Sequence, residues 1–301
     1  GINAEYGENM DKLENYQDIK ALGKGAYGAV NLVKYVPENK EYAMKIIPLG
    51  KLDQYQKKCL QHEIDIHQKL DHPNIIKLMS SFEENNNKYV ILELANSSSL
   101  YELLNQRAAY QSPLSRQEIQ KICVQILMAL NYLHEKNIIH RDIKPENIFL
   151  NQDQNENLMV KLGDFGLAKE NISDSVVGTY YYMAPEMFKR EKYGTEIDVW
   201  AFGCVFYTMI SFNLPFYSQN SEYVKLIKQI KYKKLQDKKA QQVLNQIFVA
   251  SKNRLTSKQL LDFGFFKQSD SYTTETEEEP LLVTVENTPS VNGVFKKTCC
   301  C

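Results

Sequence analysis

Two short runs of polar residues constrain this chain more than any other feature. The first, His140-Arg141-Asp142-Ile143-Lys144-Pro145-Glu146-Asn147, places a carboxylate, a lysine and an amide on one loop. The second, Asp164-Phe165-Gly166, follows after a stretch that can hold a short strand and a turn. Phosphoryl transfer needs such a set: a base for the attacking hydroxyl, a cation for the moving phosphate, and oxygens for two Mg²⁺ ions. The two runs therefore predict a phosphoryl-transfer site.

Together the runs match the H-R-D-x-K-P-x-N and D-F-G motifs of protein kinases. Further kinase motifs lie before and after these two runs, all in the order typical of kinases. They are Gly23-Lys24-Gly25-Ala26-Tyr27-Gly28-Ala29-Val30, Tyr42-Ala43-Met44-Lys45, Ala184-Pro185-Glu186, Asp198-Val199-Trp200-Ala201-Phe202-Gly203 and Arg254. The glycine run alone is also found in dinucleotide-binding folds. The chain is similar to eukaryotic protein kinases over residues 16–266. It most resembles NIMA-related kinases, with Aurora-, polo- or autophagy-initiating-type kinases as alternatives.

This resemblance implies an α+β, bilobal protein kinase fold. The small lobe, residues 16–94, is expected to be mainly antiparallel β with one key helix, and the large lobe, residues 95–266, mainly α-helical. Apolar periodicity agrees with this division. Strands are expected at 19–22, 29–35, 42–47, 75–80 and 89–93, and helices at 54–70, 114–135, 196–211, 222–230, 241–249 and 257–261. Residues 1–15 are expected to be a loose leader and 267–301 a disordered tail.

Composition narrows the class of protein. The chain has 301 residues, 43% of them hydrophobic, and a net charge of −1, so we expect no nucleic-acid partner. It has no apolar run of about 18 residues and no secretory signal, so neither a membrane span nor secretion is expected. Cys59, Cys123 and Cys204 are predicted to be reduced core thiols of a cytoplasmic protein.

The resemblance implies an ATP site in the small lobe and at the link to the large lobe. The glycines allow a turn to lie close over the phosphates. Lys45 is expected to reach the α- and β-phosphates, Leu92 to be the gatekeeper, and the backbone of residues 93–95 to bind the adenine edge. The expected nucleotide-binding residues are Leu22, Gly23, Gly25, Gly28, Val30, Ala43, Lys45, Leu92, Glu93, Ala95, Phe149 and Asp164.

A second set is expected to carry the chemistry. Asp142 would orient the substrate hydroxyl and accept its proton, Lys144 would steady the moving phosphate, and Asn147 and Asp164 would hold Mg²⁺. Lys144, together with Thr179 in G-T-x-x-Y-M-A-P-E, is typical of Ser/Thr kinases. Tyr180 departs from the proline common in relatives and leaves the peptide preference open.

Lys45 needs a carboxylate that positions it. Glu63 is the expected partner, because it lies mid-helix where kinases place this glutamate, whereas the rival Asp65 would point away. His67, four residues on, replaces the usual Leu or Met. It is read as a tolerated substitution or as a residue that makes activity depend on a phosphate or a partner.

Regulation and attachment are expected outside this core. Ser175 is the expected activating phosphosite, with Arg141 and Lys169 as its phosphate pocket and an upstream kinase or autophosphorylation in trans as its source. In the tail, Cys299, Cys300 and Cys301 are candidates for palmitoylation or double prenylation beside Lys296 and Lys297, which would attach the kinase to a membrane surface. A zinc site and an unmodified tail are the alternatives.

Two other function classes compete with an ATP- and Mg²⁺-dependent Ser/Thr kinase that acts on protein substrates. A kinase-fold scaffold without catalysis would have lost Lys45, Glu63, Asp142, Asn147 or Asp164, and none is lost. A small-molecule or lipid kinase is disfavoured by the complete segment through Ala184-Pro185-Glu186, which builds a platform for peptides.

Overall fold

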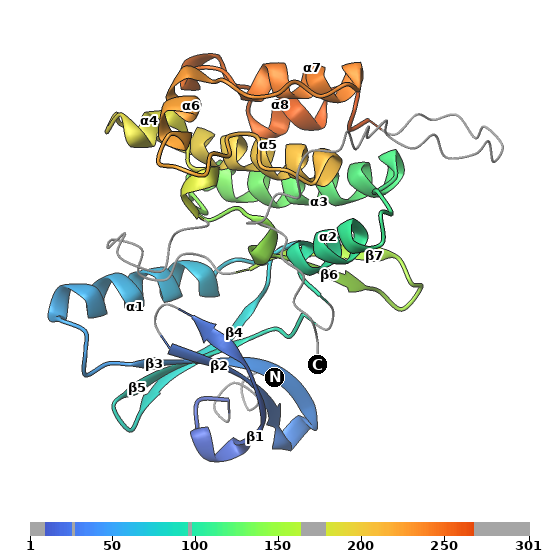
Figure 1. The fold of residues 1–301 in the computed structure, drawn as a ribbon. Coiled ribbons are helices and arrows are strands. Elements are labelled where there is room, and N and C mark those ends of the chain that lie inside the picture. Colours follow the sequence, from blue (N-terminus) through green and yellow to red (C-terminus); the bar gives the residue numbers. More distant parts are fainter. Residues whose placement is uncertain (1–9, 26–27, 96–97, 164–178, 268–301) are drawn as a thin grey trace. The chain divides into compact units, whose positions relative to one another are not determined.

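The computed structural model describes residues 10–25, 28–95, 98–163 and 179–267. The chain divides into two compact units, with residues up to 95 in unit 1 and residues 98–163 and 179–267 in unit 2. Figure 1 shows strands predominating in the first and helices in the second. The α+β fold class predicted from the sequence is confirmed.

Unit 1 is built on one five-stranded antiparallel sheet, in the order β1-β2-β3-β5-β4. Its strands are β1 (Tyr16–Gly25), β2 (Gly28–Tyr35), β3 (Lys40–Pro48), β4 (Leu78–Glu84) and β5 (Asn87–Leu92). Helix α1 (Gln54–Gln68) starts at a capping box in which Asp53 and Gln56 satisfy each other's backbone N–H groups. The strand expected at 75–80 is displaced, because residues 75–77 precede β4 and its pairing with β5 runs from Leu78 to Glu84.

Two apolar clusters bury both faces of this sheet. Because side chains alternate along a strand, Tyr42 and Met44 face one cluster while Ile47, an odd number of residues away, faces the other. The α1 cluster contains Ile47, Leu49, Leu60, Ile64, Leu78 and Val90. The Tyr35 cluster contains Met10, Val33, Tyr35, Tyr42, Met44, Phe82, Tyr89 and Ile91.

Within the expected leader, Met10 and Leu13 pack against the sheet of unit 1, whereas Asp11, Lys12 and Glu14 are exposed. Met10 is buried in the Tyr35 cluster, and the Tyr16 hydroxyl donates to the Met10 carbonyl at 2.7 Å. Leu13, which opens the 3-10 helix η1 (Leu13–Asn15), packs there as well and donates its N–H to Glu84. Residues 1–9 lie outside the described part of the chain.

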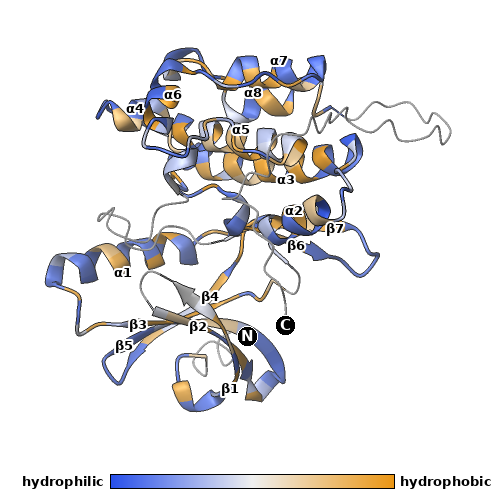
Figure 2. Cartoon of the chain, in the orientation of Figure 1, coloured by the Kyte–Doolittle hydropathy of each residue, from blue (hydrophilic) through white to orange (hydrophobic). Residues whose placement is uncertain are grey.

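Unit 2 is organised around two helices, α3 (Arg116–Glu135) and α5 (Glu196–Ser211). Apolar colour runs along both in Figure 2. Every residue of α5 from Ile197 to Ile210 is buried, which explains why its sequence is apolar on all sides. The other helices of the described part are α2 (Leu100–Ala109), α4 (Pro185–Phe188), α6 (Tyr223–Gln229), α7 (Lys238–Ile247) and α8 (Ser257–Leu261). Short 3-10 turns include η3 (Pro145–Asn147) and η4 (Thr179–Tyr182).

A β-hairpin within unit 2 was not expected as such. Strands β6 (Ile148–Gln152) and β7 (Leu158–Leu162) pair in the register Ile148↔Leu162. Asp153 holds the connecting turn, because its carboxylate accepts the N–H groups of Asn155 and Asn157 at 2.8 Å each. The hairpin brings the residues that flank it, Asn147 and Gly163, next to each other.

Candidate active site

The predicted catalytic loop, residues 140–147, is held by the buried side chain of His140. Its Nδ1 accepts the Asp142 N–H at 3.1 Å, and its Nε2 lies 2.8 Å from the Gly163 carbonyl. These partners assign the ring proton to Nε2. The imidazole therefore links the loop to the end of β7, and it fixes the backbone at Asp142.

Asp198 anchors the same loop from α5, a role that the sequence analysis missed. Its carboxylate accepts the N–H groups of His140 at 2.8 Å and Arg141 at 3.0 Å, and it lies 2.8 Å from His134 Nε2. These bonds accommodate the left-handed backbone of Arg141, with φ of 73°. The signal was visible: a buried carboxylate in an otherwise apolar helix requires several partners.

Asp142, Asn147 and Lys144 form a tight group, as the motif predicted. The Asn147 amide donates to the Asp142 carbonyl at 2.8 Å and to its Oδ2 at 2.7 Å. Lys144 Nζ lies 3.6 Å from the same Oδ2. Asp142 and Asn147 are only 3% and 5% exposed, so both side chains are held in fixed positions.

The Asn147 side chain offers an oxygen that can bind a hard cation. Its Nδ2 group makes both hydrogen bonds to Asp142, so its Oδ1 points to a different side, where it accepts no hydrogen bond from a described residue. Amide oxygens are ligands that Mg²⁺ accepts. The Gly163 N–H donates to the Asn147 carbonyl at 3.0 Å, so the residue before Asp164 is adjacent to Asn147. Asp164 itself lies outside the described residues.

Unit 1 places the predicted nucleotide residues on neighbouring strands. Lys45 is 8% exposed on β3, where it pairs with Val30 of β2 and with Val90 of β5. Ala43 pairs with Leu92 in the same way. Glu63 is half-buried beside Ile64 on α1, whereas its rival Asp65 is exposed and bonded to Gln61. The choice of Glu63 over Asp65 agrees with this burial pattern.

The glycine turn joins β1 to β2. Gly23 pairs with Val30 and Gly25 with Gly28. At Gly28, with φ of 156°, an added Cβ would collide with the Ile46 carbonyl, so only glycine lets β2 approach β3 there. Leu22, just before the turn, is exposed. Ala26 and Tyr27 lie outside the described residues.

The first residue of the predicted hinge, Glu93, already donates its N–H to a hydrogen bond within unit 1. Glu93 N donates to the Lys77 carbonyl at 2.8 Å, and the Glu93 carboxylate accepts the Lys77 N–H at 3.1 Å. Leu94 and Ala95, the other residues of the predicted hinge, follow Glu93 outside any strand. Phe149 lies in unit 2, half-buried on β6, where it bridges to Ser99.

His67 is a core residue of unit 1. It is 3% exposed, and its Nε2 lies 2.7 Å from the Ile76 carbonyl. The ring ties the end of α1 to the segment before β4, so the substituted position has a structural use. This agrees with the interpretation of a tolerated substitution.

Arg141, the predicted phosphate-binding residue, contacts an aromatic ring. Its guanidinium lies 5.9 Å from the centroid of Tyr193, and Nη1 lies 3.4 Å from the Tyr193 hydroxyl. The side chain is exposed. Ser175 and Lys169 lie outside the described residues, as do Cys299, Cys300 and Cys301.

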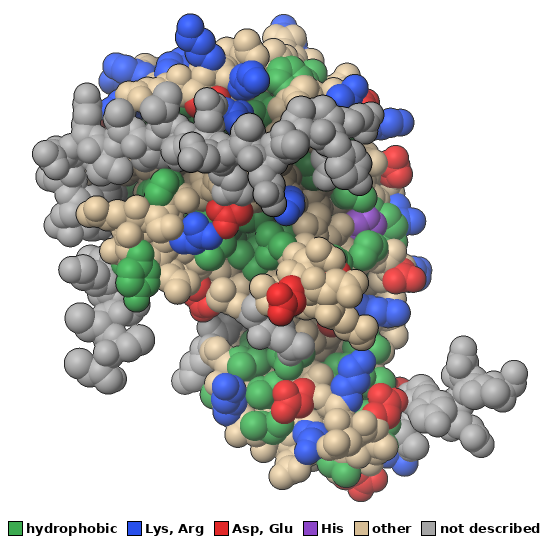
Figure 3. All heavy atoms as spheres, turned by 90° about the vertical axis from the view of Figure 1, so that its right-hand side faces the viewer, with side chains coloured by type: hydrophobic (Ala, Val, Ile, Leu, Met, Phe, Trp, Pro, Cys, Tyr) green, Lys and Arg blue, Asp and Glu red, His purple; other side chains and the backbone are tan. Residues whose placement is uncertain are grey.

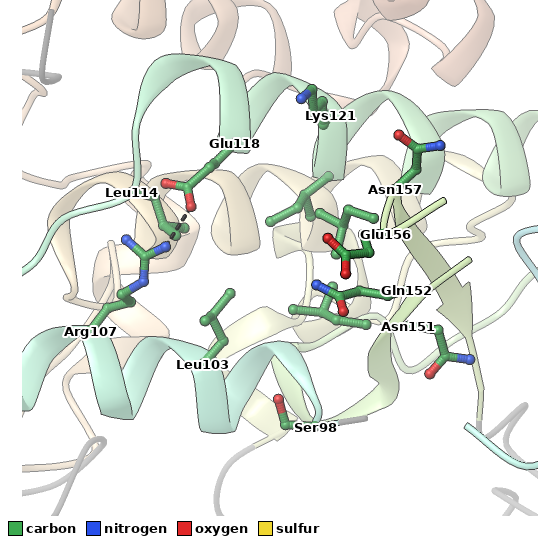
Figure 4. Close-up of a pocket in the computed structure, with 13 residues that line it drawn as sticks. Ser98, Leu103, Arg107, Leu114, Glu118, Lys121, Asn151, Gln152, Glu156 and Asn157 are labelled. Atoms are coloured by element: carbon green, nitrogen blue, oxygen red, sulfur yellow. Dashed lines mark hydrogen bonds and ion pairs between the residues drawn. The ribbon is translucent and has the colours of Figure 1, made fainter. Parts of the chain in front are cut away.

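The segment after Thr179 packs close to the catalytic loop. Tyr182 and Met183 border a small cavity together with Arg141 and Asp142. A separate, larger cavity of about 520 Å³ lies between α2, α3 and the β6–β7 hairpin, lined by Leu103, Arg107 and Glu118 among others (Figure 4). None of the predicted site residues lines it, so it is distinct from the predicted ATP site.

Arg254 pairs with Glu186, the glutamate of the Ala184-Pro185-Glu186 motif. Arg254 and Glu186 form a two-pronged ion pair, with Nη1–Oε1 at 2.7 Å and Nη2–Oε2 at 3.2 Å. Both are buried. Arg254 also donates to the carbonyls of Ile247, Glu196 and Val249, so it joins α4, α5 and α7.

Among the described residues, no group of three or more His, Cys, Asp or Glu side chains is arranged to hold a metal ion. No helix there combines the length and apolar character needed to cross a bilayer.

Comparison with known proteins agrees with this geometry. The protein kinase domain family matches residues 16–268. The serine/threonine-protein kinase Nek5 of Homo sapiens is 32% identical over 213 residues, 69% of this chain. The serine/threonine-protein kinase plk-1 of Caenorhabditis elegans is 37% identical over 219 residues, 71% of this chain. The mouse serine/threonine-protein kinase Nek1 is 31% identical over 213 residues.

The chain is much shorter than these relatives. It spans 29% of human Nek5, 33% of plk-1 and 17% of mouse Nek1. The predicted resemblance to NIMA-related kinases, with polo-type kinases as an alternative, is confirmed by the presence of both kinds among them. Protein kinases as a family use ATP and Mg²⁺ and act on protein substrates. The kinase family covers both described units, and the chain belongs to it.

Proposed function

We propose that this chain is a Ser/Thr protein kinase that transfers the γ-phosphoryl group of ATP to hydroxyls of protein substrates. The observation that supports this most is the fixed group of Asp142, Asn147 and Lys144. It combines a base, a metal ligand and a cation, with Asn147 Nδ2 at 2.7 Å and Lys144 Nζ at 3.6 Å from Asp142 Oδ2. The kinase domain is proposed to span residues 16–266, as a small lobe of 16–94 and a large lobe of 95–266.

Each residue of the catalytic loop has a distinct part in this proposal. Asp142 orients the substrate hydroxyl and takes its proton as the new oxygen–phosphorus bond forms. The hydrogen bonds from Asn147 fix the carboxylate for this task. Lys144, on the same side as Oδ2, offers its charge to the phosphoryl oxygens. The protein thus supplies position and electrostatics.

Unit 1 is proposed to hold the nucleotide. Its phosphates would lie against the turn of Gly23, Gly25 and Gly28 and against Lys45, which Glu63 positions. Val30 and Ala43 are proposed to contact the adenine, and Phe149 of unit 2 is a further proposed nucleotide-binding residue. Leu22, Leu92, Glu93 and Ala95 complete the proposed binding residues. Asn147 and Asp164 would hold Mg²⁺, which would offset the negative charge of the ATP phosphates during transfer.

Regulation and location form the finer part of the proposal. Phosphorylation of Ser175, by another kinase or in trans, would add a charge of about −1.5 to −2 that Arg141 and Lys169 can pair. Palmitoylation or double prenylation of Cys299, Cys300 and Cys301 would attach the chain to a membrane beside Lys296 and Lys297. The amino-acid types at these positions support both ideas.

The test is a peptide array incubated with the full chain, Mg²⁺ and γ-labelled ATP. Asp142→Asn keeps size and polarity but removes the base, and it should lower turnover by about 10²- to 10⁴-fold. Asp262→Asn is the matched control, because that carboxylate is exposed at the end of α8. Lys45→Met and Asp164→Ala should lower turnover by a comparable factor.

The outcomes separate the function classes. Phosphorylated Ser or Thr peptides that disappear with Asp142→Asn support the proposal. An array that stays blank while the chain still binds ATP would favour a scaffold. Wild-type turnover in Asp142→Asn would remove Asp142 from its assigned role.

A further inference from the structure

Unit 2 carries a dense group of lysines that no part of the proposed function uses. Residues 225–239 contain seven lysines and one acid, Asp237, although the whole chain has a net charge of −1. All seven side chains are exposed. We call them the lysine surface: Lys225, Lys228, Lys231, Lys233, Lys234, Lys238 and Lys239.

The lysine surface is continuous over two helices and their connection. Lys225 and Lys228 lie three residues apart on α6, and therefore on one side of that helix. Lys238 and Lys239 are the first two residues of α7, and the other three lie between the helices. Figure 3 shows Lys and Arg side chains gathered over this end of unit 2.

The fold does not neutralise these charges. Among the described residues, no carboxylate forms an ion pair with any of the seven ammonium groups. Asp237 is already engaged, since it caps α7 through the Ala240 N–H at 2.8 Å and pairs with Arg116. Lys238 and Lys239 also stand at a helix N-terminus, where the helix dipole disfavours positive charge. Helix stability therefore does not explain the placement of Lys238 and Lys239, whereas an anionic partner would explain it.

The chain leaves its described part beside this surface. The Gln120 side chain donates to the Phe265 carbonyl at 2.7 Å, and the Arg116 guanidinium lies 5.2 Å from the Phe265 ring centroid. The same Arg116 pairs with Asp237 at the start of α7. Lys267, the last described residue, is thus two residues from a contact with the edge of the lysine surface.

The residues that follow have the complementary charge. Residues 268–279 contain five acids, Asp270, Glu275, Glu277, Glu278 and Glu279, and no Lys or Arg. Glu275 is eight residues beyond Lys267, so an extended chain can carry it up to about 29 Å from there. Arg116 contacts both Phe265 and Asp237, so Lys238 and Lys239 at the start of α7 lie within this reach.

We propose that the acidic segment 270–279 binds the lysine surface of the same chain. Direct connection gives the segment an effective concentration on the order of millimolar, which favours it over a free anionic partner. The binding requires neither phosphoryl transfer nor lipidation.

Amine footprinting of the full chain tests this proposal. An acetylating reagent is applied at low ionic strength, and the modified lysines are quantified by mass spectrometry. The neutral-tail variant is Asp270→Asn with Glu275, Glu277, Glu278 and Glu279 each →Gln, which removes charge but keeps size. We expect a several-fold rise in acetylation of the lysine surface in this variant. Exposed lysines of unit 1, namely Lys20, Lys51, Lys58 and Lys69, serve as internal controls and should not change.

Added salt and anionic vesicles distinguish the acidic segment from a membrane as the partner of the lysine surface. At about 1 M salt the Debye length falls to about 3 Å, so the unaltered chain should become as reactive as the neutral-tail variant. Equal acetylation of the lysine surface in both chains at low salt would overturn the proposal. Protection by phosphatidylserine vesicles that is the same with either tail would also overturn it, in favour of a membrane.

Discussion

Arg254 and Glu186 form an ion pair that water barely reaches, with exposed fractions of 6% and 3%. Removal of one partner leaves the other charge buried without compensation. We therefore expect Arg254→Gln to lower the free energy of unfolding by about 3–5 kcal/mol. Trp200, the single tryptophan, lies 5.0 Å from the Arg254 guanidinium, so its fluorescence reports unfolding of unit 2 in urea.

Arg107→Gln is the matched control for that experiment. Arg107 pairs with Glu118, but both side chains are partly exposed, at 27% and 38%. Solvent screening limits such a pair to about 1 kcal/mol or less. Urea midpoints that shift equally in the two variants would contradict the importance assigned to burial.

Asp198→Asn should weaken catalysis through the loop it holds. The new amide must direct its NH₂ group at one of the backbone donors, His140 N or Arg141 N, so the loop shifts. Displacement of a catalytic group by about 1 Å can reduce turnover by about 10²-fold. We expect kcat to fall by that order while KM for ATP is unchanged, because Asp198 contacts no predicted nucleotide residue. A raised KM with full kcat would show that this positioning role is wrong.

Helices that are buried on all sides were the easiest elements to predict. Helix α5 begins and ends where the apolar run predicted, at Glu196 and Ser211. Helix α7 starts at Lys238, three residues before the expected position, because its first two residues, Lys238 and Lys239, are charged and exposed and carry no apolar signal. Local patterns locate the buried part of a helix better than its solvated end.

Elements that depend on distant partners were missed or misplaced. The β6–β7 hairpin consists of two five-residue strands around a polar turn, and Asp153 organises it through bonds invisible in the sequence pattern. Met10 and Leu13 are packed only because a sheet formed by later residues offers them an apolar face. Because residues 1–15 are mostly polar, the sequence pattern did not predict these two contacts.

The candidate site shows the same contrast. The motif located Asp142, Lys144 and Asn147, because their types and spacing are fixed by the chemistry. It did not reveal that His140 and Asp198 hold the loop, since that task depends on where α5 lies against it. Motifs point to candidate catalytic groups through residue type and spacing, whereas the residues that hold these groups become visible only in three dimensions.

Thiol labelling tests the burial of the cysteines. Burial raises the pKa of the Cys123 and Cys204 thiols, and both side chains are fully buried, so neither should react with iodoacetamide at pH 8.5. Cys59 is half-exposed on α1 and should be labelled. In a chain with Cys299, Cys300 and Cys301 changed to Ser, we expect one label in the folded protein and three in urea, by intact mass. Rapid labelling of Cys204 without urea would contradict the packing of α5.

Tyr207 should make stability depend on alkaline pH. It is 5% exposed, and its hydroxyl donates to the Lys233 carbonyl at 2.9 Å. Burial, with a smaller effect of Tyr232, raises the pKa of this hydroxyl from 10.0 to about 12. The unfolded chain therefore loses the proton first as pH rises. The stabilising effect is complete below pH 10 and decreases between pH 10 and 12, by about 2–3 kcal/mol in total.

Tyr207→Phe removes this titration together with one hydrogen bond. At pH 8 the variant should be less stable than the unaltered chain by about 1 kcal/mol. Because phenylalanine does not ionise, the variant should lose less stability on the way to pH 12, and the difference between the two should shrink or reverse. Urea unfolding followed by Trp200 fluorescence from pH 8 to 12 measures both curves. Tyr110→Phe, at a side chain that is 77% exposed, should run parallel to the unaltered chain. Parallel curves for Tyr207→Phe as well would show that its hydroxyl ionises as readily in the folded protein as in the unfolded one.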